Sequence, residues 1–393
     1  MSTYTILIIL SSLVIFSYLF DIIARRTKFP SVLLLLLTGI GLQIIVTTLR
    51  LPDINLFTIL PTLGTIGLIL IVFEGALELK YERKRHSLIR RSFLSALIIL
   101  LASSAVIGWI IHLITDFPFQ TCLLNAVPFS VISSAIAIPS VSGLETGKKE
   151  FVVYESTFSD ILGIILFNFL LFNEKINAVS FVWLGLDTLI VLVVSSVFCL
   201  LLLYIIGRIN HQVKFFLILA ILVLVYSIGR AWHLSTLIIV LALGLFMNNA
   251  EQIRLPLFRK YFLYPKYKDD LLQLYRLSAE SAFLVRTFFF VIFGFIISLD
   301  ELNNWEVAGY GAIILAVIYL VRAVYLKWVN RSGLKPELFI NPRGLISILL
   351  FLTIPDTLRI PGIDTGLLFL IILVTSIIMS IGLMTTRRKI LNE

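Results

Sequence analysis

Residues 151–172, FVVYESTFSDILGIILFNFLLF, decide the fold. The stretch is long enough to cross the roughly 30 Å hydrocarbon layer of a membrane as a helix, which takes about 20 apolar residues. It nevertheless contains two carboxylates, Glu155 and Asp160. An acidic side chain inside the bilayer is costly, so its presence indicates a function. The stretch therefore predicts a membrane helix that carries a functional carboxylate.

The composition places the whole chain in a membrane. Of the 393 residues, 59% are apolar and 14% are charged, whereas soluble domains carry about 25% charged residues. Cys122 and Cys199 lie in apolar segments without metal-site or CxxC spacing, so we interpret them as packing residues. The first apolar stretch has no basic segment before it and is followed by Arg25, Arg26 and Lys28. It is interpreted as a membrane helix, not a signal peptide.

Thirteen segments approach the length of a membrane span. They are Tyr4–Ile23, Ser31–Leu49, Leu56–Leu79, Phe93–Ile114, Phe119–Val141, Phe151–Phe172, Phe181–Ile206, Val213–Ile228, Leu234–Met247, Leu277–Leu299, Trp305–Trp328, Leu338–Ile354 and Leu367–Leu383. We therefore predict an all-α polytopic membrane protein of 13 transmembrane helices, in which residues 1–393 form a single membrane domain. The chain ends soon after Arg387, Arg388 and Lys389, so no soluble regulatory domain is expected.

Basic residues set the orientation of these spans, because cytoplasmic loops are enriched in Lys and Arg. With the N-terminus outside and the C-terminus cytoplasmic, the external loops hold only Arg50, Lys175, Arg230 and Arg359. Merging the short eighth and ninth spans would move the basic stretch that follows them outside, so thirteen spans are preferred. The connection 248–276 is either an amphipathic segment on the bilayer surface or a plain linker. The expected location is a bacterial inner (plasma) membrane.

The fifth span of each half is interrupted. Thirteen spans divide into six, one and six, which gives the two halves opposite topology, as in transporters built from two inverted six-helix repeats. Span five contains Asn125, Pro128, Ser130, Ser133, Ser134, Pro139 and Ser140, and span twelve contains Asn341, Pro342, Arg343 and Gly344. Proline removes a helical hydrogen bond, so the freed backbone groups need partners in protein or in a wet cavity. We predict crossing discontinuous helices whose unwound backbone offers oxygen ligands to a small cation. The alternative is a plain proline kink in each span.

Asp160 is the principal candidate for ion binding. It lies about ten residues into span six, which is roughly 15 Å from the cytoplasmic edge at 1.5 Å per residue. Ser156 and Gly163 share its helical face, so a hydroxyl, a carboxylate and a gap are aligned. Burial disfavours a bare carboxylate, so a proton and a cation can compete for it and their fluxes become coupled. The alternative is a structural Asp160 paired permanently with an arginine.

Three further charged side chains in the spans have predicted partners. Glu155 and Arg322 in span eleven lie at comparable depth, so we predict a mainly structural ion pair between them. Arg343, at the break in span twelve, is predicted to neutralise the carbonyl ends of the broken helices.

The remaining charged residues in the spans are less informative. Glu74, near the inner end of span three, either contributes to ion binding or extends to the interface. Glu280 and Arg286 in span ten are interpreted as an internal ion network.

Several of these motifs resemble the monovalent cation/proton antiporter superfamily. Residues 155–163, ESTFSDILG, resemble its span-six motif, in which Glu-Ser-x-x-Asn-Asp is typical of the sodium/proton exchanger branch. Residues 73–79, FEGALEL, resemble the end of its third span, and residues 342–344 resemble its Leu-Arg-Gly break in span twelve. Arg322 stands where that family has a basic residue in span eleven.

The resemblance implies how the protein works. Asp160 would bind the ion and the proton, with Ser156 as a further ligand of the metal ion and Glu155 paired with Arg322. It also implies a homodimer and alternating access. The dimerisation scaffold would comprise residues 1–79 and 213–299, the moving core 93–172 and 305–385, and a linker helix 181–206.

Two departures from the family pattern affect these expectations. Ser159 stands where the exchanger branch has Asn and the electrogenic branch has a second Asp. One carboxylate at the site predicts electroneutral exchange of one cation per proton. Residues 133–137, SSAIA, replace the exchangers' Thr-Asp-Pro break and are more similar to Kef-type potassium efflux systems. Ser133, Ser134 and Ser159 thus join the candidate ion-binding residues, and the choice among Na⁺, Li⁺ and K⁺ stays open.

Other classes of membrane protein fit the sequence less well. A channel would need a selectivity filter, and no TVGYG-like run is present. A sodium-coupled symporter of similar fold stays open as an alternative. An intramembrane enzyme would need a second catalytic group such as a His-Glu-x-x-His run, which is missing. We therefore expect a transporter that is not an enzyme, binds no cofactor or nucleic acid, and contacts membrane lipid.

Overall fold

The structure is a computed structural model that describes most of the chain. The described ranges are 3–27, 30–49, 60–79, 85–141, 143–173, 177–208, 214–231, 236–253, 256–263, 265–297, 305–329 and 335–390. These ranges are helical and contain no β-strand. They form two compact units, which are described separately. The first unit covers residues 1–64, 87–163 and 284–393, and the second covers residues 65–86 and 164–283.

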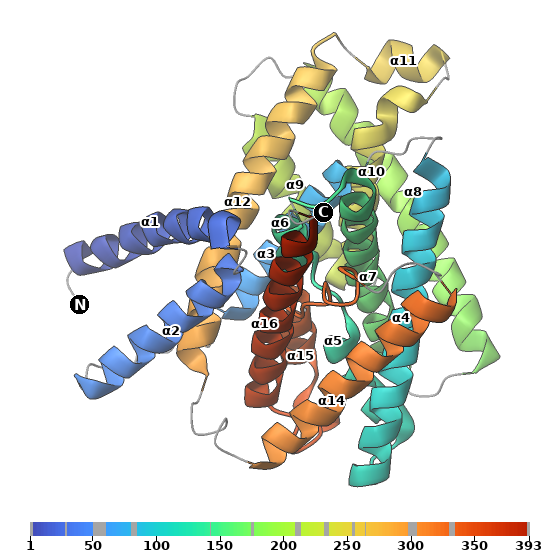
Figure 1. Cartoon of the computed structure of the whole chain (residues 1–393). Coiled ribbons are helices and arrows are strands. Elements are labelled where there is room, and N and C mark those ends of the chain that lie inside the picture. The colour runs from blue at the N-terminus through green and yellow to red at the C-terminus, as the bar shows by residue number, and fades with distance from the viewer. Residues whose placement is uncertain are drawn as a thin grey trace. The chain divides into compact units, whose positions relative to one another are not determined.

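The first unit contains the residues predicted to bind the ion, on helices that are labelled in Figure 1. Its helices are α1 (Thr3–Thr27), α2 (Ser31–Thr48), α4 (His86–Thr115), α5 (Phe119–Ser130), α6 (Ser134–Ser140), most of α7 (Thr146–Phe172), α14 (Trp305–Val324), α15 (Leu345–Thr353) and α16 (Thr365–Ile390). A π-helical turn, η3 (Tyr325–Val329), continues α14. Within this unit α1 packs on α2, α5 on α15, and α14 on α16.

Two glycines let α2 cross closely over the end of α12, which spans Tyr267–Ile296. A Cβ atom on Gly39 would lie 2.8 Å from the Phe295 amide nitrogen, and one on Gly294 would lie 3.1 Å from the Leu36 Cα. Both obstacles are backbone, so no side-chain movement would relieve them. Small residues allow such approaches between membrane helices. The crossing fixes the α1–α2 pair to the C-terminal end of α12.

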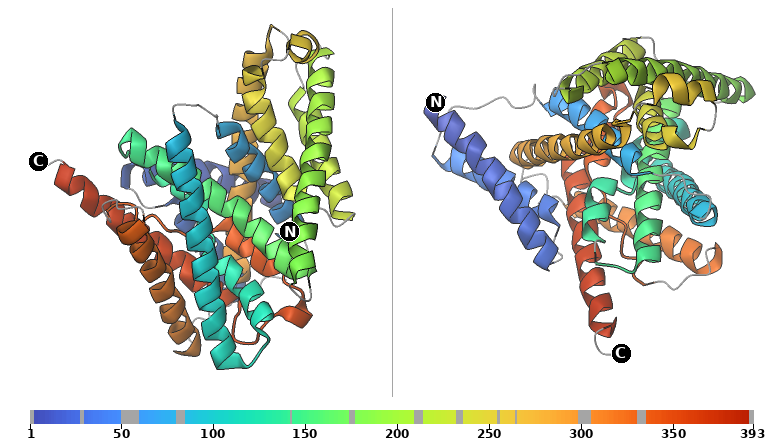
Figure 2. Two further views of the ribbon diagram at one scale, coloured as in Figure 1. Left: turned by 90° about the vertical axis from the view of Figure 1, so that its right-hand side faces the viewer. Right: turned by 90° about the horizontal axis from the view of Figure 1, so that it is seen from above.

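The second unit is a smaller helical bundle (Figure 2). It contains most of α3 (Leu60–Glu78), α8 (Ala178–Arg208), α9 (Lys214–Ala231), α10 (Thr236–Asn249), α11 (Pro256–Phe262) and the first part of α12. Helix α10 packs against α8 and α9, and α11 packs against α8. Gly244 of α10 lies close to the Phe73 carbonyl of α3, 3.1 Å from where its Cβ would be.

Many of the helices match predicted spans. Seven described helical segments are long and apolar enough to cross a membrane, and four shorter apolar ones lie at 10–24, 193–204, 215–229 and 237–252. Helix α9 ends at Ala231 and α10 begins at Thr236, and residues 232–235, where spans eight and nine were expected to separate, lie outside the described ranges. The count of thirteen, the inverted repeat and the division into core and scaffold stay predictions.

Two predicted spans differ from the structure. Span ten was expected to begin at Leu277, but α12 begins at Tyr267, because polar residues such as Asp269 and Asp270 are compatible with a helix that extends beyond the apolar region. Part of the connection 248–276 is therefore helical. Span twelve was expected from Leu338, but only α15 is helical. Residues 335–339 form turns instead of a helix, because Pro336, Pro342 and Gly344 disfavour helical backbone before α15.

Candidate ion-binding site

The first helix break separates α5 from α6. Helix α5 ends at Ser130, and the backbone is extended at Val131 (ψ 130°) and at Ser133 (ψ 115°) before α6 begins. Pro128 lies in the last turn of α5, where it removes a helical donor. The Ile132 and Ser133 amides thus have no acceptor within α5 or α6. Their partners come from two other parts of the first unit.

The second break supplies one of these partners. Residues 340–344 are not helical and lead into α15, which packs beside α5 (Figure 1). The Ser133 amide donates a hydrogen bond to the Pro342 carbonyl at 2.9 Å. A Cβ atom on Gly344 would lie 2.5 Å from the Ser133 hydroxyl, so a glycine is needed for the close approach. The two interrupted segments therefore touch through their backbones.

Helix α7 supplies the other partners from consecutive residues. The Ser159 hydroxyl accepts a hydrogen bond from the Ile132 amide at 2.9 Å. The Asp160 carboxylate accepts one from the Ser134 amide at 3.1 Å, through Oδ2. One helix turn further on, Gly163 leaves room for the Val131 side chain, which a Cβ there would overlap. The gap that we expected beside Asp160 is therefore filled by the first break, since Val131 occupies it.

The Asp160 carboxylate is only partly hydrogen-bonded among the described residues. Its side chain is buried, and within the described ranges its Oδ1 atom has no hydrogen-bond partner. The Ser133 hydroxyl, next to the residue that donates to Asp160, is also buried without a partner among the described residues. A buried, unpaired carboxylate oxygen is costly. A proton or a small cation bound at Oδ1 would remove that cost.

Ser156 is buried four residues before Asp160 on the same helix. Its hydroxyl donates to the Val152 carbonyl of its own helix at 2.8 Å. The hydrogen is therefore occupied, while the oxygen lone pairs remain able to accept a bond or a cation. Its role as a ligand stays a prediction.

Glu155 and Arg322 meet in a buried ion pair. The Arg322 guanidinium donates two hydrogen bonds to the Glu155 carboxylate, at 2.7 and 3.2 Å, and both side chains are almost fully buried. The Ser95 hydroxyl of α4 donates to Glu155 at 2.5 Å. Arg322 Nε also donates to the Glu337 carbonyl at 2.8 Å. The pair therefore connects α4, α7, α14 and the segment before α15.

Arg343 is buried at the end of α5. Its Nε donates to the Phe129 carbonyl at 2.5 Å, and its Nη1 donates to the Asn341 backbone and side-chain oxygens at 3.0 and 2.7 Å. Its own amide donates to the Thr375 hydroxyl of α16 at 3.1 Å. A cation at the carbonyl end of a helix opposes the negative end of the helix dipole. Within the described ranges, neither Arg322 nor Arg343 forms an ion pair with Asp160.

Ser95 and Thr375 were not singled out from the sequence. Ser92, Ser95 and Ser103 recur on one buried face of α4, and such a row of small polar residues in an apolar helix is the signal that could have indicated a polar partner. The contact from Thr375 carries no such signal, because α16 contains several similar residues.

The other charged residues of the predicted spans, Glu74, Glu280 and Arg286, lie in different surroundings. Glu74 is half-buried in α3, within the second unit, and Glu280 is exposed on α12. Arg286 donates to the Ala135 carbonyl of α6 at 3.4 Å. It therefore reaches the helix after the first break, which the interpretation as an ion network with Glu280 did not anticipate. Among the described residues, no group of three or more His, Cys, Asp or Glu side chains could hold a metal ion.

Replacing Ser159 with Ala tests how the first break is held. The variant would leave the buried Ile132 amide without its acceptor, which costs about 1–3 kcal/mol. We expect a lower midpoint of thermal unfolding, measured by size-exclusion chromatography after heating. Ser140→Ala is the matched control, because the Ser140 hydroxyl only donates to its own helix at the Ile136 carbonyl. Equal midpoints for the two variants would contradict this role of Ser159.

The sequence as a whole matches one protein family. The sequence model described as "Sodium/hydrogen exchanger, transmembrane" matches residues 10–388, nearly the entire chain. The chain belongs to the sodium/hydrogen exchanger family. This membership confirms the resemblance that the motifs in spans three, six, eleven and twelve indicated. No curated protein matches this exchanger by sequence.

The fold of the exchanger is similar to that of a solved archaeal protein. The structure of the sodium proton antiporter MjNhaP1 from Methanocaldococcus jannaschii at pH 8 has a TM-score of 0.69 and 21% sequence identity, with 98% of this chain and 96% of that chain covered. A three-dimensional electron microscopy map of the same antiporter gives a TM-score of 0.68 and 22% identity over 97% and 95% of the chains. Likeness at this identity establishes the fold.

The family also sets the class of activity. This exchanger is a multi-pass integral membrane protein, and its family carries out cation/proton exchange. It is therefore a transporter.

Proposed function

We propose that this exchanger moves Na⁺ or Li⁺ in one direction and H⁺ in the other by alternating access, with Asp160 as the carboxylate that binds either ion. The observation that carries the proposal is the Oδ1 atom of Asp160, which has no partner among the described residues and is buried where two helix breaks touch. Four serines are the proposed neighbours of the ion. Ser133 and Ser134 lie at the first break, and Ser156 and Ser159 precede Asp160 on α7. Glu155, Arg322 and Arg343 are proposed to hold the surrounding helices in place.

The remaining details follow from the family resemblance and from the residue types. One carboxylate binds one cation or one proton, so we propose electroneutral exchange with a 1:1 ratio. A homodimer, a cytoplasmic C-terminus and a bacterial inner membrane are part of the same proposal. The serines of the first break keep K⁺ as a possible cation, because the Asp that helps sodium exchangers bind Na⁺ is missing there.

The proposal is tested with purified protein in liposomes that contain a pH-sensitive dye. Li⁺, Na⁺ and K⁺ are added in turn to the outside of vesicles with an acidic interior. We expect Na⁺ and Li⁺ to raise the internal pH, K⁺ to have little effect, and no transport current to appear under a voltage step. Exchange driven by K⁺ alone would replace Na⁺ with K⁺ as substrate, and a current would exclude the 1:1 ratio. Proton movement driven by none of the three cations would reject the proposal.

A further inference from the structure

Helices α4 and α14 are joined tightly at one end of their contact. Ile99 of α4 packs in a buried cluster with Tyr325 and Leu326, which continue α14 as η3. Ser95 adds a polar link at this end through Glu155, which pairs with Arg322. The two helices are therefore held together here by apolar packing and by the buried ion pair.

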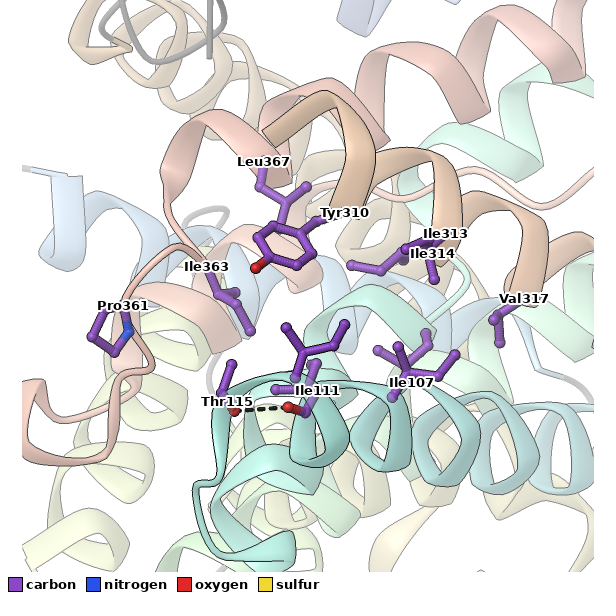
Figure 3. A pocket seen from close by; sticks show the side chains of 12 residues that line it. Ile107, Ile111, Thr115, Tyr310, Ile313, Ile314, Val317, Pro361, Ile363 and Leu367 are labelled. Atoms are coloured by element: carbon purple, nitrogen blue, oxygen red, sulfur yellow. Dashed lines mark hydrogen bonds between the residues drawn. The ribbon is translucent and has the colours of Figure 1, made fainter. Parts of the chain in front are cut away.

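The other end of the same contact is hollow. Ile111 lies twelve residues after Ile99 on α4, and Ile314 lies twelve residues before Leu326 on α14. Both line a pocket with about 430 Å³ of empty space, including its open mouth (Figure 3). Pro361 and the residues after it close one side. Twelve helical residues span about 18 Å. Because the helices pack at one end and enclose space at the other, we call this pocket the α4–α14 wedge.

The wedge is suited to hydrocarbon and not to water. Its lining is aliphatic except for Thr115 and Tyr310, and the Thr115 hydroxyl already donates to the Ile111 carbonyl at 2.7 Å. A buried water requires two to four polar partners, which this lining does not offer. An empty wedge would forgo the dispersion contacts of all these side chains.

The mouth of the wedge opens onto the lipid-facing surface. Two of its lining residues, Ile114 of α4 and Ile313 of α14, are 46% and 41% exposed. Trp109 and Leu113 of α4 and Leu320 of α14 are exposed on the same two helices. In a membrane protein, exposed apolar side chains on spanning helices contact acyl chains. The hollow is therefore continuous with the surface that lipid covers.

We propose that one acyl chain of a membrane phospholipid occupies the α4–α14 wedge and fills the space between the two helices. The lipid replaces the side-chain contacts that α4 and α14 do not make with each other at this end. Since α4 carries Ser95 and α14 carries Arg322, the bound chain supports the helices that hold Glu155 from the opposite end of their contact. It is a structural ligand, separate from the ion site.

The experiment uses the full-length protein in liposomes that contain phosphatidylglycerol with a photoreactive diazirine near the end of one acyl chain. After illumination, lipid-modified peptides are mapped by mass spectrometry. We expect modification to concentrate on residues 107–115 and 310–317. Ile314→Trp, whose larger side chain fills the wedge, should remove the lipid modification from both segments. Leu320→Trp is the matched control, because it adds the same side chain to α14 at an exposed position outside the wedge, and it should leave the pattern unchanged.

A second readout follows the stability of the protein. Added phosphatidylglycerol should raise the thermal midpoint of the delipidated parent and of Leu320→Trp, but not that of Ile314→Trp. If Ile314→Trp does not elute as a folded protein, Ile110→Phe, whose side chain fills the wedge from α4, replaces it in both measurements. Modification spread evenly over the exposed faces, or a wedge signal that survives both filling variants, would overturn the proposal. Cross-links from a second copy of the chain at these segments, without lipid adducts, would overturn it as well.

Discussion

Replacement of Asp160 by Asn is expected to reduce cation/proton exchange to the level of protein-free liposomes. Asparagine has the same shape and keeps an oxygen that can accept the Ser134 amide, which lies 3.1 Å from the Asp160 carboxylate. The asparagine amide does not gain or lose a proton near neutral pH, and it has no negative charge to attract a cation. The fold should therefore persist while transport is lost. The measurement is the change in internal pH after addition of Na⁺ or Li⁺, with parent and variant reconstituted at equal density.

Asp364→Asn serves as the matched control for this experiment. The Asp364 carboxylate accepts the Leu367 amide at 2.8 Å at the start of α16, a role that asparagine also fills. The same chemical change is therefore made in the same unit, away from the helix breaks. This variant should exchange ions like the parent. Undiminished exchange by Asp160→Asn would rule out Asp160 as the shared binding group.

Replacement of Arg322 by Met should have the largest effect on stability. The variant would leave the Glu155 carboxylate buried with only Ser95 as a donor from the present network. Removing one partner of a buried ion pair costs about 3–5 kcal/mol. We expect a corresponding loss in the free energy of unfolding, measured with denaturant in mild detergent. Lys327→Met on η3 is the control, because Lys327 is exposed and a surface change of this kind costs at most about 0.5 kcal/mol.

The double variant Glu155→Leu with Arg322→Met separates stability from transport. Replacing both members of a buried pair with apolar residues is often neutral or stabilising. We expect the double variant to regain most of the stability that Arg322→Met loses and to retain ion exchange. If Arg322→Met were as stable as the parent, the structural role of the pair would be wrong. If the stable double variant were inactive, the pair would belong to the transport mechanism.

The sequence allowed the broad architecture to be predicted because its signals are local. Long apolar runs specify membrane helices, and Pro128 and Pro342 with Gly344 mark the places where the helices are interrupted. The partnership of Glu155 with Arg322 was also predictable, because two opposite charges at similar depth in an apolar environment strongly favour each other.

Contacts between distant segments could not be predicted in the same way. Helical spacing showed that Gly163 shares a face with Asp160. Such spacing predicts which residues lie on the same face of a helix, but not which group packs against that face. The structure places Val131 there. Ser95 and the Ile132–Ser159 hydrogen bond were missed for the same reason, since small polar residues occur throughout the chain. The beginning of α12 was missed because hydropathy marks the edge of the apolar region and not the edge of the helix.

The bond from the Ser133 amide to the Pro342 carbonyl has a consequence for how the protein can be altered. Because neither group belongs to a side chain, the bond does not depend on which side chain stands at position 133, unless proline there removes the amide hydrogen. Side chains of similar size should therefore be exchangeable at Ser133 without separating the two interrupted segments. In a library of substitutions at this position, proline should be among the least tolerated residues.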